Sequence, residues 1–150
     1  METDRPEVAS FVLDASIATV WLLPDEVESV ADQTLKLLNT ADPIVPDLFW
    51  REMRNVLLTA HRRKRISLPE VWHSMARLEQ LGIITAPMAS GTLILPLAER
   101  HSLTAYDAAY LALALERRLP LATLDRRLAE AAMREGVEPP DIVSPPAPKP

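Results

Sequence analysis

The chain contains no cysteine, which excludes disulfide bonds, cysteine-based zinc sites and thiol nucleophiles. It also lacks a run of about 18 apolar residues, the length that a helix needs to cross a membrane. The first ten residues, METDRPEVAS, are acidic and polar, whereas a secretory signal peptide carries basic and then apolar residues. These absences predict a cytoplasmic protein that spans no membrane.

Positive charge is scarce, because 16 Lys and Arg residues stand against 21 Asp and Glu residues and give a net charge of −5. Nonspecific nucleic-acid binding usually needs a basic surface, so this balance argues against a general binder of polyanions. One run, HRRKR at 61–65, concentrates positive charge. It either guides a nucleic-acid backbone or forms a solvated helix end, where the helix dipole favours cations.

The 150 residues, 48% of them hydrophobic, suffice for one domain with a real core. Short apolar runs alternate with longer helical patterns, which predicts an α/β domain over residues 10–143. Residues 1–9 are expected to form a flexible lead-in, and residues 144–150 a proline-rich disordered tail. We expect strands at 11–13, 44–45, 83–84, within 119–124, and at 142–143. We expect helices at 16–23, 27–38, 47–63, 68–82, 92–101, 105–117 and 125–135.

Asp107 interrupts the segment AYDAAYLALAL, which is apolar almost all the way round a helix. An ionised carboxylate in such surroundings destabilises a fold by several kcal/mol unless a cation or hydrogen-bond donors compensate it. Its place in the first turn of the helix contributes only about 0.3–1 kcal/mol of stabilisation through the helix dipole. We therefore interpret Asp107 as a functional acid.

Asp14 and Asp125 each follow an apolar run that is predicted to form a strand. In open parallel sheets, ligands bind beyond the carboxyl ends of the strands, so both positions suit a functional acid. Each also precedes a helix, where Asp is a favoured N-cap, and this alternative stays open. Two hydroxyl residues are nearby: Ser16 either orients Asp14 or caps the helix, and Thr123 either joins the acids or fills a strand position.

Glu52 lies on the predicted helix at 47–63, about 60° from the centre of the apolar stripe. This border position is also typical of a solvated flank, and Asn55 lies beside it one turn later. If Glu52 meets the three aspartates in space, their mutual repulsion requires a divalent metal ion. Oxygen ligands suit Mg²⁺ or Mn²⁺, which can support hydrolysis of a phosphodiester.

Four segments of the chain resemble the PIN-domain family, and within it the VapC-type toxins of bacterial toxin–antitoxin pairs. These segments are VLDAS (12–16), WREMRNVLL (50–58), TAYDAAYLALA (104–114) and LATLDRRL (121–128). They follow the order and the approximate intervals of the family, and the resemblance extends over residues 11–143. It implies a single-domain α/β/α sandwich whose parallel sheet carries the acids at the carboxyl ends of its strands.

The resemblance also implies a Mg²⁺-dependent endoribonuclease, a homodimer, and neutralisation by a small VapB-like antitoxin. It assigns catalysis to an acidic quartet of Asp14, Glu52, Asp107 and Asp125. It assigns a supporting role to Ser16, Asn55 and Thr123. Our hypothesis is that an activated water hydrolyses an RNA phosphodiester, with Asp14 and Asp107 as direct metal ligands and with Glu52 and Asp125 holding a second ion or waters. The RNA-binding residues would be Arg62, Arg63, Lys64 and Arg65.

Two other functions fit parts of the sequence. A phosphatase of the haloacid dehalogenase type also begins with an Asp at a strand end, but it needs a second Asp where this chain has Ser16. The other alternative is a binding module for RNA or protein that keeps the PIN shell without turnover. The presence of all four acids argues against this second alternative.

The histidines and tryptophans provide no clear site. The three histidines lack the spacing of metal ligands, and we expect all of them on the surface: His61, His73 and His101. Trp21 lies in the apolar segment IATVWLL, which either packs in the core or exposes a groove for a partner helix such as that of an antitoxin. Trp50 and Trp72 are expected to pack or to lie at a dimer interface.

Overall fold

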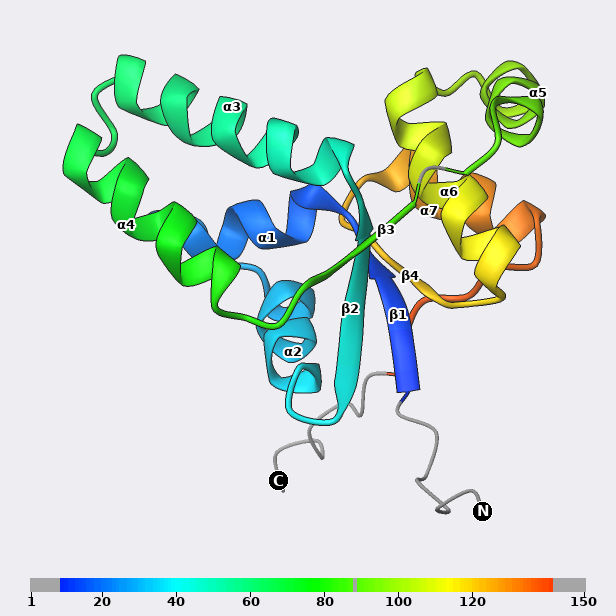
Figure 1. The fold of residues 1–150 in the computed structure, drawn as a ribbon, viewed down its shortest axis with the longest axis horizontal. Helices are drawn as coiled ribbons and strands as arrows, with labels where there is room; N and C mark the ends of the chain where they lie inside the picture. Colours follow the sequence, from blue (N-terminus) through cyan, green and yellow to red (C-terminus); the bar gives the residue numbers. More distant parts are fainter. Residues whose placement is uncertain (1–8, 88, 142–150) are drawn as a thin grey trace, which may run out of the picture.

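The computed structural model describes residues 9–87 and 89–141, which form a parallel sheet between two layers of helices (Figure 1). The sheet order is β3-β2-β1-β4, and all described pairings are parallel. The strands are β1 (Ala9–Leu13), β2 (Ala41–Pro46), β3 (Ile84–Ala86) and β4 (Leu121–Ala122). Because β1 lies between β2 and β4, Val12 is in register with both Ile44 and Leu121.

The helices cover both faces of the sheet, with the first four on one side and the last three on the other (Figure 1). The first four are α1 (Ala15–Leu22), α2 (Ser29–Leu37), α3 (Leu48–Arg62) and α4 (Leu68–Glu79). The last three are α5 (Gly91–His101), α6 (Ala105–Arg117) and α7 (Arg126–Arg134). This arrangement confirms the predicted single-domain α/β/α sandwich.

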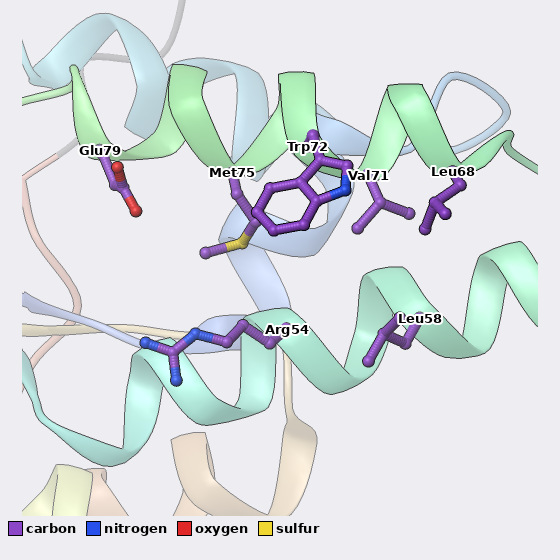
Figure 2. Close-up of a pocket in the computed structure, with 7 residues that line it drawn as sticks. All are labelled: Arg54, Leu58, Leu68, Val71, Trp72, Met75 and Glu79. Atoms are coloured by element: carbon purple, nitrogen blue, oxygen red, sulfur yellow. The ribbon is translucent and has the colours of Figure 1, made fainter.

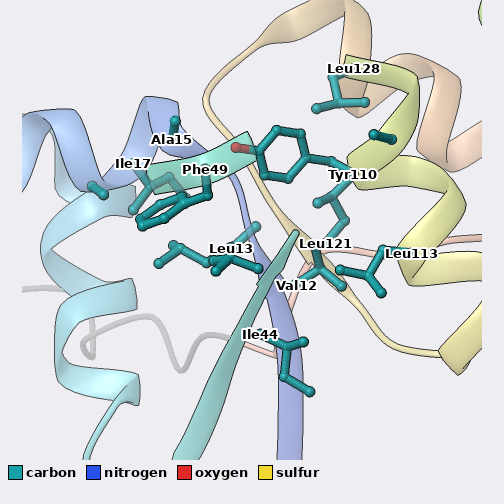
Figure 3. Close-up of a cluster of buried hydrophobic side chains, with 14 of the residues drawn as sticks. Val12, Leu13, Ala15, Ile17, Ile44, Phe49, Tyr110, Leu113, Leu121 and Leu128 are labelled. Atoms are coloured by element: carbon teal, nitrogen blue, oxygen red, sulfur yellow. The ribbon is translucent and has the colours of Figure 1, made fainter. Parts of the chain in front are cut away.

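The core lies on both sides of β1 because both faces of a parallel sheet are covered by helices. Phe11, Val12 and Leu13 are at most 1% exposed. In the core cluster, Ile17 and Phe49 approach Leu13 from one helical layer, and Tyr110 and Leu128 belong to the other (Figure 3). The burial of consecutive residues along β1 brings its carboxyl end, and the residue that follows it, to the centre of the domain.

Local capping explains where several helices begin. Ser67 and Glu70 form a reciprocal capping box at the start of α4, with Pro69 in the first turn. The Thr104 hydroxyl accepts a hydrogen bond from the Asp107 amide at 3.1 Å and starts α6 at the predicted residue. The turn between α3 and α4 contains Lys64 with a φ of +61°, so these two helices form a hairpin that projects from the sheet (Figure 1).

Several boundaries differ from the prediction. β2 extends over Ala41–Pro46 instead of residues 44–45, although it contains two prolines. Its first residues pair with β1, and its pairing with β3 begins at Ile44, after Pro43. The helix predicted at 27–38 begins only at Ser29, since the Glu28 carboxylate caps it, and Val27 is 88% exposed. Pro96 lies inside α5 without ending it.

The predicted termini are largely untested. Ala9 begins β1 and so does not belong to the predicted lead-in, whereas residues 1–8 lie outside the described part of the chain. The predicted strand at 142–143 and the tail at 144–150 also lie outside it. In the residues that the structure describes, no helix is both long and apolar enough to cross a membrane.

The tryptophans have three different environments. The Trp21 indole donates to the Ala31 carbonyl at 2.7 Å, so α2 covers this face of α1 and the packing interpretation is favoured over an open groove. Trp50 packs edge-on against Phe49 and donates to the Thr85 hydroxyl at 2.8 Å. Trp72 is 73% exposed on α4 and does not join the core.

Candidate active site

Asp14 occupies the turn between β1 and α1 at the carboxyl edge of the sheet and is only 4% exposed. Its Oδ2 accepts a hydrogen bond from the Ser16 hydroxyl at 2.6 Å and another from the Thr123 hydroxyl at 2.7 Å. The carboxylate makes no capping hydrogen bond to α1, although Asp14 stands at the N-cap position. The two hydroxyls therefore fix the orientation of the Asp14 carboxylate, and its role as a functional acid stays a prediction.

The same two hydroxyls fix the connection between β4 and α7. The Ser16 hydroxyl accepts the Leu124 amide at 2.9 Å, and the Thr123 hydroxyl accepts the Asp125 amide at 3.0 Å. Each hydroxyl therefore has its oxygen engaged by a backbone donor and directs its proton to Asp14. This network places Ser16 and Thr123 against Asp14, which is one of the two alternatives that the sequence left open for each of them.

Asp125 combines the two interpretations that the sequence left open. Its Oδ1 accepts the Leu128 amide at 3.1 Å, so it caps α7. Its charge nevertheless acts on Asp14 and on Asp107, because it raises the pKa of both carboxyls. A capping carboxylate can use its second oxygen for another partner.

Glu52 reaches the site from α3 and is tied to α6. The Tyr110 hydroxyl, on a fully buried side chain, donates to Glu52 Oε1 at 2.8 Å. Burial raises the pKa of Tyr110 well above its usual range, and the charge of Glu52 adds to this, so the phenol stays a donor. Sequence reasoning missed Tyr110, although it lies three residues after Asp107 and therefore on the same side of α6.

The electrostatics show that the four acids influence one another. Burial, together with the charges of Asp14 and Asp107, raises the pKa of Glu52 to about 7, although the hydrogen bond from Tyr110 lowers it. Burial also raises the pKa of Asp14 and of Asp107, each with a contribution from a neighbouring carboxylate. Groups from the β1–α1 turn, α3, α6 and the β4–α7 connection thus form one cluster of repelling charges.

The donor chemistry of this cluster fits a hard divalent cation. All four side chains offer carboxylate oxygens, and a cation would relieve the repulsion that raises their pKa values. Over residues 9–87 and 89–141, no three His, Cys, Asp or Glu side chains lie close enough to enclose an ion by themselves. Mg²⁺ commonly uses one or two carboxylates and keeps several waters, so the acids suit a hydrated ion better than a closed protein cage.

Asn55 stands apart from the other predicted supporting residues. It is exposed and lines a hollow that also includes Thr19, Glu26 and Arg63. Among the described contacts, its side chain makes no hydrogen bond with the acids. The structure therefore separates Asn55 from Ser16 and Thr123.

The predicted basic run lies at the far end of α3, about 15 Å along the helix axis from Glu52. Arg62, Arg63 and Lys64 are exposed. Arg65 instead forms a bidentate ion pair with Asp25, with Nη2 2.6 Å from Oδ1, and also approaches Glu26 at 3.5 Å. It ties the α1–α2 connection to the α3–α4 turn, which distinguishes it from the other three cations.

The prediction for the histidines is wrong in one case. The His101 side chain is 4% exposed, and its Nε2 lies 3.4 Å from Glu135 Oε2 at the end of α7. The residue follows an exposed Arg and precedes a polar Ser, so its local sequence hides a contact made by a distant helix. His61 is half-buried with Nδ1 3.0 Å from the Ile66 carbonyl, and His73 is exposed.

A hollow of about 240 Å³ lies between α3 and α4 (Figure 2). Trp72 and Met75 of α4 cover it from one side, and Arg54 and Leu58 of α3 from the other. Its lining includes none of the four acids, so this hollow is separate from the carboxylate cluster.

Residues 11–133 match the PIN domain, and the chain belongs to the PIN-domain family. Ribonuclease VapC3 of Pyrobaculum aerophilum is 33% identical to it over 125 residues, which cover 79% of this chain and 92% of that protein. This family membership confirms the resemblance to VapC-type proteins and displaces the phosphatase of the haloacid dehalogenase type.

Two solved structures share the fold. PAE2754 from Pyrobaculum aerophilum has a TM-score of 0.65 and 21% identity, covering 87% of this chain and 86% of that one. A toxin–antitoxin complex from Klebsiella pneumoniae includes a chain with a TM-score of 0.53 and 18% identity, covering 74% of this chain and 82% of that one. At these identities the likeness concerns the fold.

Proposed function

We propose that this chain is a VapC-type endoribonuclease toxin that hydrolyses RNA phosphodiester bonds at its carboxylate cluster. The observation that carries this proposal is Asp14, a buried carboxylate that is held by Ser16 and Thr123 and interacts electrostatically within a group of four acids. A similar protein named a ribonuclease, with 92% of its length matched, supports the same activity.

Each part of the site has a role in this proposal. Asp14 and Asp107 would hold Mg²⁺ or Mn²⁺, and Glu52 and Asp125 would bind a second ion or orient waters. The ion, when bound, supplies positive charge at the phosphate and lowers the pKa of a water. Ser16 and Thr123 keep Asp14 in one orientation, while Tyr110 holds Glu52.

The partners follow from the family resemblance and from the toxin–antitoxin complex among the similar structures. The resemblance and this complex both support a small VapB-like antitoxin as the partner that neutralises this chain. A homodimer and a cytoplasmic location are part of the same proposal. The alternative, a PIN shell that only binds RNA or protein, is disfavoured because a binding surface has no need of four repelling carboxylates that destabilise the fold.

The first test is removal of divalent metal. We expect EDTA to abolish cleavage of a mixed single-stranded RNA, and excess Mg²⁺ or Mn²⁺ to restore it, because the acids repel phosphate without a cation. Cleavage is measured as the release of labelled fragments on a gel, and circular dichroism checks that the chelated protein stays folded. RNA that binds tightly in EDTA and is never cut, with or without metal, would instead identify a binding module.

The second test concerns the basic run. Replacing Arg62, Arg63 and Lys64 together by Gln should lower the slope of log K against log salt for RNA binding by up to about three, since each phosphate contact contributes about one. Arg65→Gln is the matched control, because its guanidinium is already paired with Asp25. A triple variant with the wild-type slope would assign these three charges to a solvated helix end.

A further inference from the structure

A second hollow, of about 290 Å³, lies between the start of α3, α5 and the start of α6. Leu48, Ile94 and Ala109 provide apolar lining, whereas Arg51 and Tyr106 provide a cation and an aromatic ring. Asp47 also lines it, so the hollow combines an apolar surface, an aromatic face and one cation that has a carboxylate beside it.

This hollow adjoins the carboxylate cluster on two helices at once. Leu48 lies one turn before Glu52 on α3, and Tyr106 lies one turn before Tyr110 on α6, so each is a neighbour of that residue on its helix surface. The 2.8 Å hydrogen bond between Tyr110 and Glu52 joins the two helices at this point. A molecule in the hollow would thus lie next to the reacting centre of the proposed nuclease.

Of the three polar lining residues, Tyr106 and Arg51 are only weakly engaged by the fold. The Tyr106 residue is 68% exposed and contributes little to the core. The Arg51 side chain is 77% exposed, and its ion pair is with Asp47 one turn earlier, at 3.5 Å. An exposed pair at this spacing contributes little to stability. Both side chains are therefore available to a ligand.

We propose that this hollow is a nucleotide subsite, in which Tyr106 stacks on a base of the RNA and Arg51 contacts the adjoining phosphate. Proteins hold single-stranded RNA by stacking its bases on aromatic rings and by placing cations along its backbone. In a chain with a net charge of −5, Arg51 is the cation of this hollow, and a phosphate can replace Asp47 as its partner because that exposed pair contributes little. This inference rests on the proposed ribonuclease function and adds where the substrate is gripped.

The test compares Tyr106→Ala and Tyr106→Phe in the full chain, with Trp72→Ala as the control. Trp72 is just as exposed, at 73%, but belongs to the separate hollow between α3 and α4. Tyr106→Ala should raise KM for cleavage of a single-stranded RNA by about 5- to 150-fold, the loss of one stacked base, with a much smaller change in kcat. Tyr106→Phe and Trp72→Ala should both behave as the wild type.

Arg51 has a separate readout. Arg51→Gln should reduce the salt slope of RNA binding by about one, and Arg51→Lys should retain the wild-type slope. These dissociation constants are measured by anisotropy with Ca²⁺ replacing Mg²⁺. An Arg51→Gln variant with an unchanged slope would overturn the phosphate contact.

A third readout uses the wild-type protein and so does not depend on any variant folding. In RNAs carrying 2-aminopurine at successive positions, fluorescence should be quenched at the position adjoining the cleaved bond, because that base stacks on Tyr106. Quenching at none of these positions would overturn the proposal.

The remaining outcomes separate the subsite from the nuclease itself. Active wild-type enzyme with an unchanged KM in Tyr106→Ala would refute the subsite and leave the ribonuclease proposal standing. A Tyr106→Ala chain that changes its sedimentation from dimer to monomer would assign the hollow to a second copy of the chain. Wild-type protein that neither binds nor cleaves any RNA would refute both proposals.

Discussion

Asp107→Asn is expected to lower kcat/KM for RNA cleavage by at least about 100-fold while the protein stays folded. Loss of a residue that only supports a metal ligand already lowers activity about 10- to 100-fold, and Asp107 is proposed to be a ligand itself. The fold should tolerate the change, because Asn has nearly the same shape and the cap of α6 is supplied by Thr104. The rate is followed by cleavage of a labelled single-stranded RNA at saturating Mg²⁺.

The control for this variant is Glu99→Gln, which makes the same change of charge at an exposed position on α5. It should cleave RNA at the wild-type rate. In metal-free buffer, Asp107→Asn should also melt at a temperature no lower than that of the wild type, because it removes one of the mutually repelling charges. Wild-type cleavage by Asp107→Asn would end the proposed mechanism, and a strongly lowered melting temperature would assign its inactivity to unfolding.

The metal-free protein is expected to lose stability as the pH rises from about 4.5 to about 7. The pKa of Glu52 is raised to about 7 in the fold, so the folded state binds this proton more tightly than the unfolded state does. The stabilisation that protonated Glu52 contributes is then fully present below its unfolded-state pKa and is lost as the pH approaches its folded-state pKa. Glu52 alone would contribute at most about 3 kcal/mol, and solvent screening of this partly buried group reduces that figure.

Asp14 and Asp107 act in the same direction, because the pKa of each is also raised. The measurement is the free energy of unfolding in urea, at a series of pH values in EDTA, for the wild type and for Glu52→Gln. The slope should be shallower in Glu52→Gln, and saturating Mg²⁺ should recover stability near pH 7, since metal binds the deprotonated acids. Stability that rises steadily over this pH range would show that the carboxylates do not form a repelling cluster.

The sequence sufficed where the signal was local or periodic. Asp107 could be found because an acid inside an apolar helix is unfavourable wherever the helix lies. Its helix was also predicted at the observed boundaries, Ala105–Arg117. The positions of Asp14 and Asp125 at strand ends could be found because short apolar runs and the helices that follow them indicate parallel strands.

The roles of these two residues could not be separated in the same way. Asp14 and Asp125 have the same local pattern of strand, Asp and helix, yet only the Asp125 side chain caps its helix. The difference comes from the hydroxyls of Ser16 and Thr123, which both donate hydrogen bonds to Asp14. Thr123 lies more than 100 residues away from Asp14 in the sequence. A hydrogen bond of this kind depends on the packing of β1 against β4, which no short pattern contains.

The other differences from prediction have the same origin. Tyr110 looked like one more apolar residue of its helix, and Arg65 like one more cation of a basic run. Each has a partner far along the chain, Glu52 for the phenol and Asp25 for the guanidinium. The partner of Trp21 is the Ala31 carbonyl on α2, which the local sequence around Trp21 likewise does not reveal.

The hydrogen bond between Tyr110 on α6 and Glu52 on α3 also joins the two helical layers directly. A hydroxyl–carboxylate bond of 2.8 Å weakens once its atoms separate by about half an ångström more. A protein that bound the projecting α3–α4 hairpin and displaced α3 by that small amount would break the hydrogen bond that holds Glu52. Such a protein would inhibit the proposed nuclease without contacting the acids themselves.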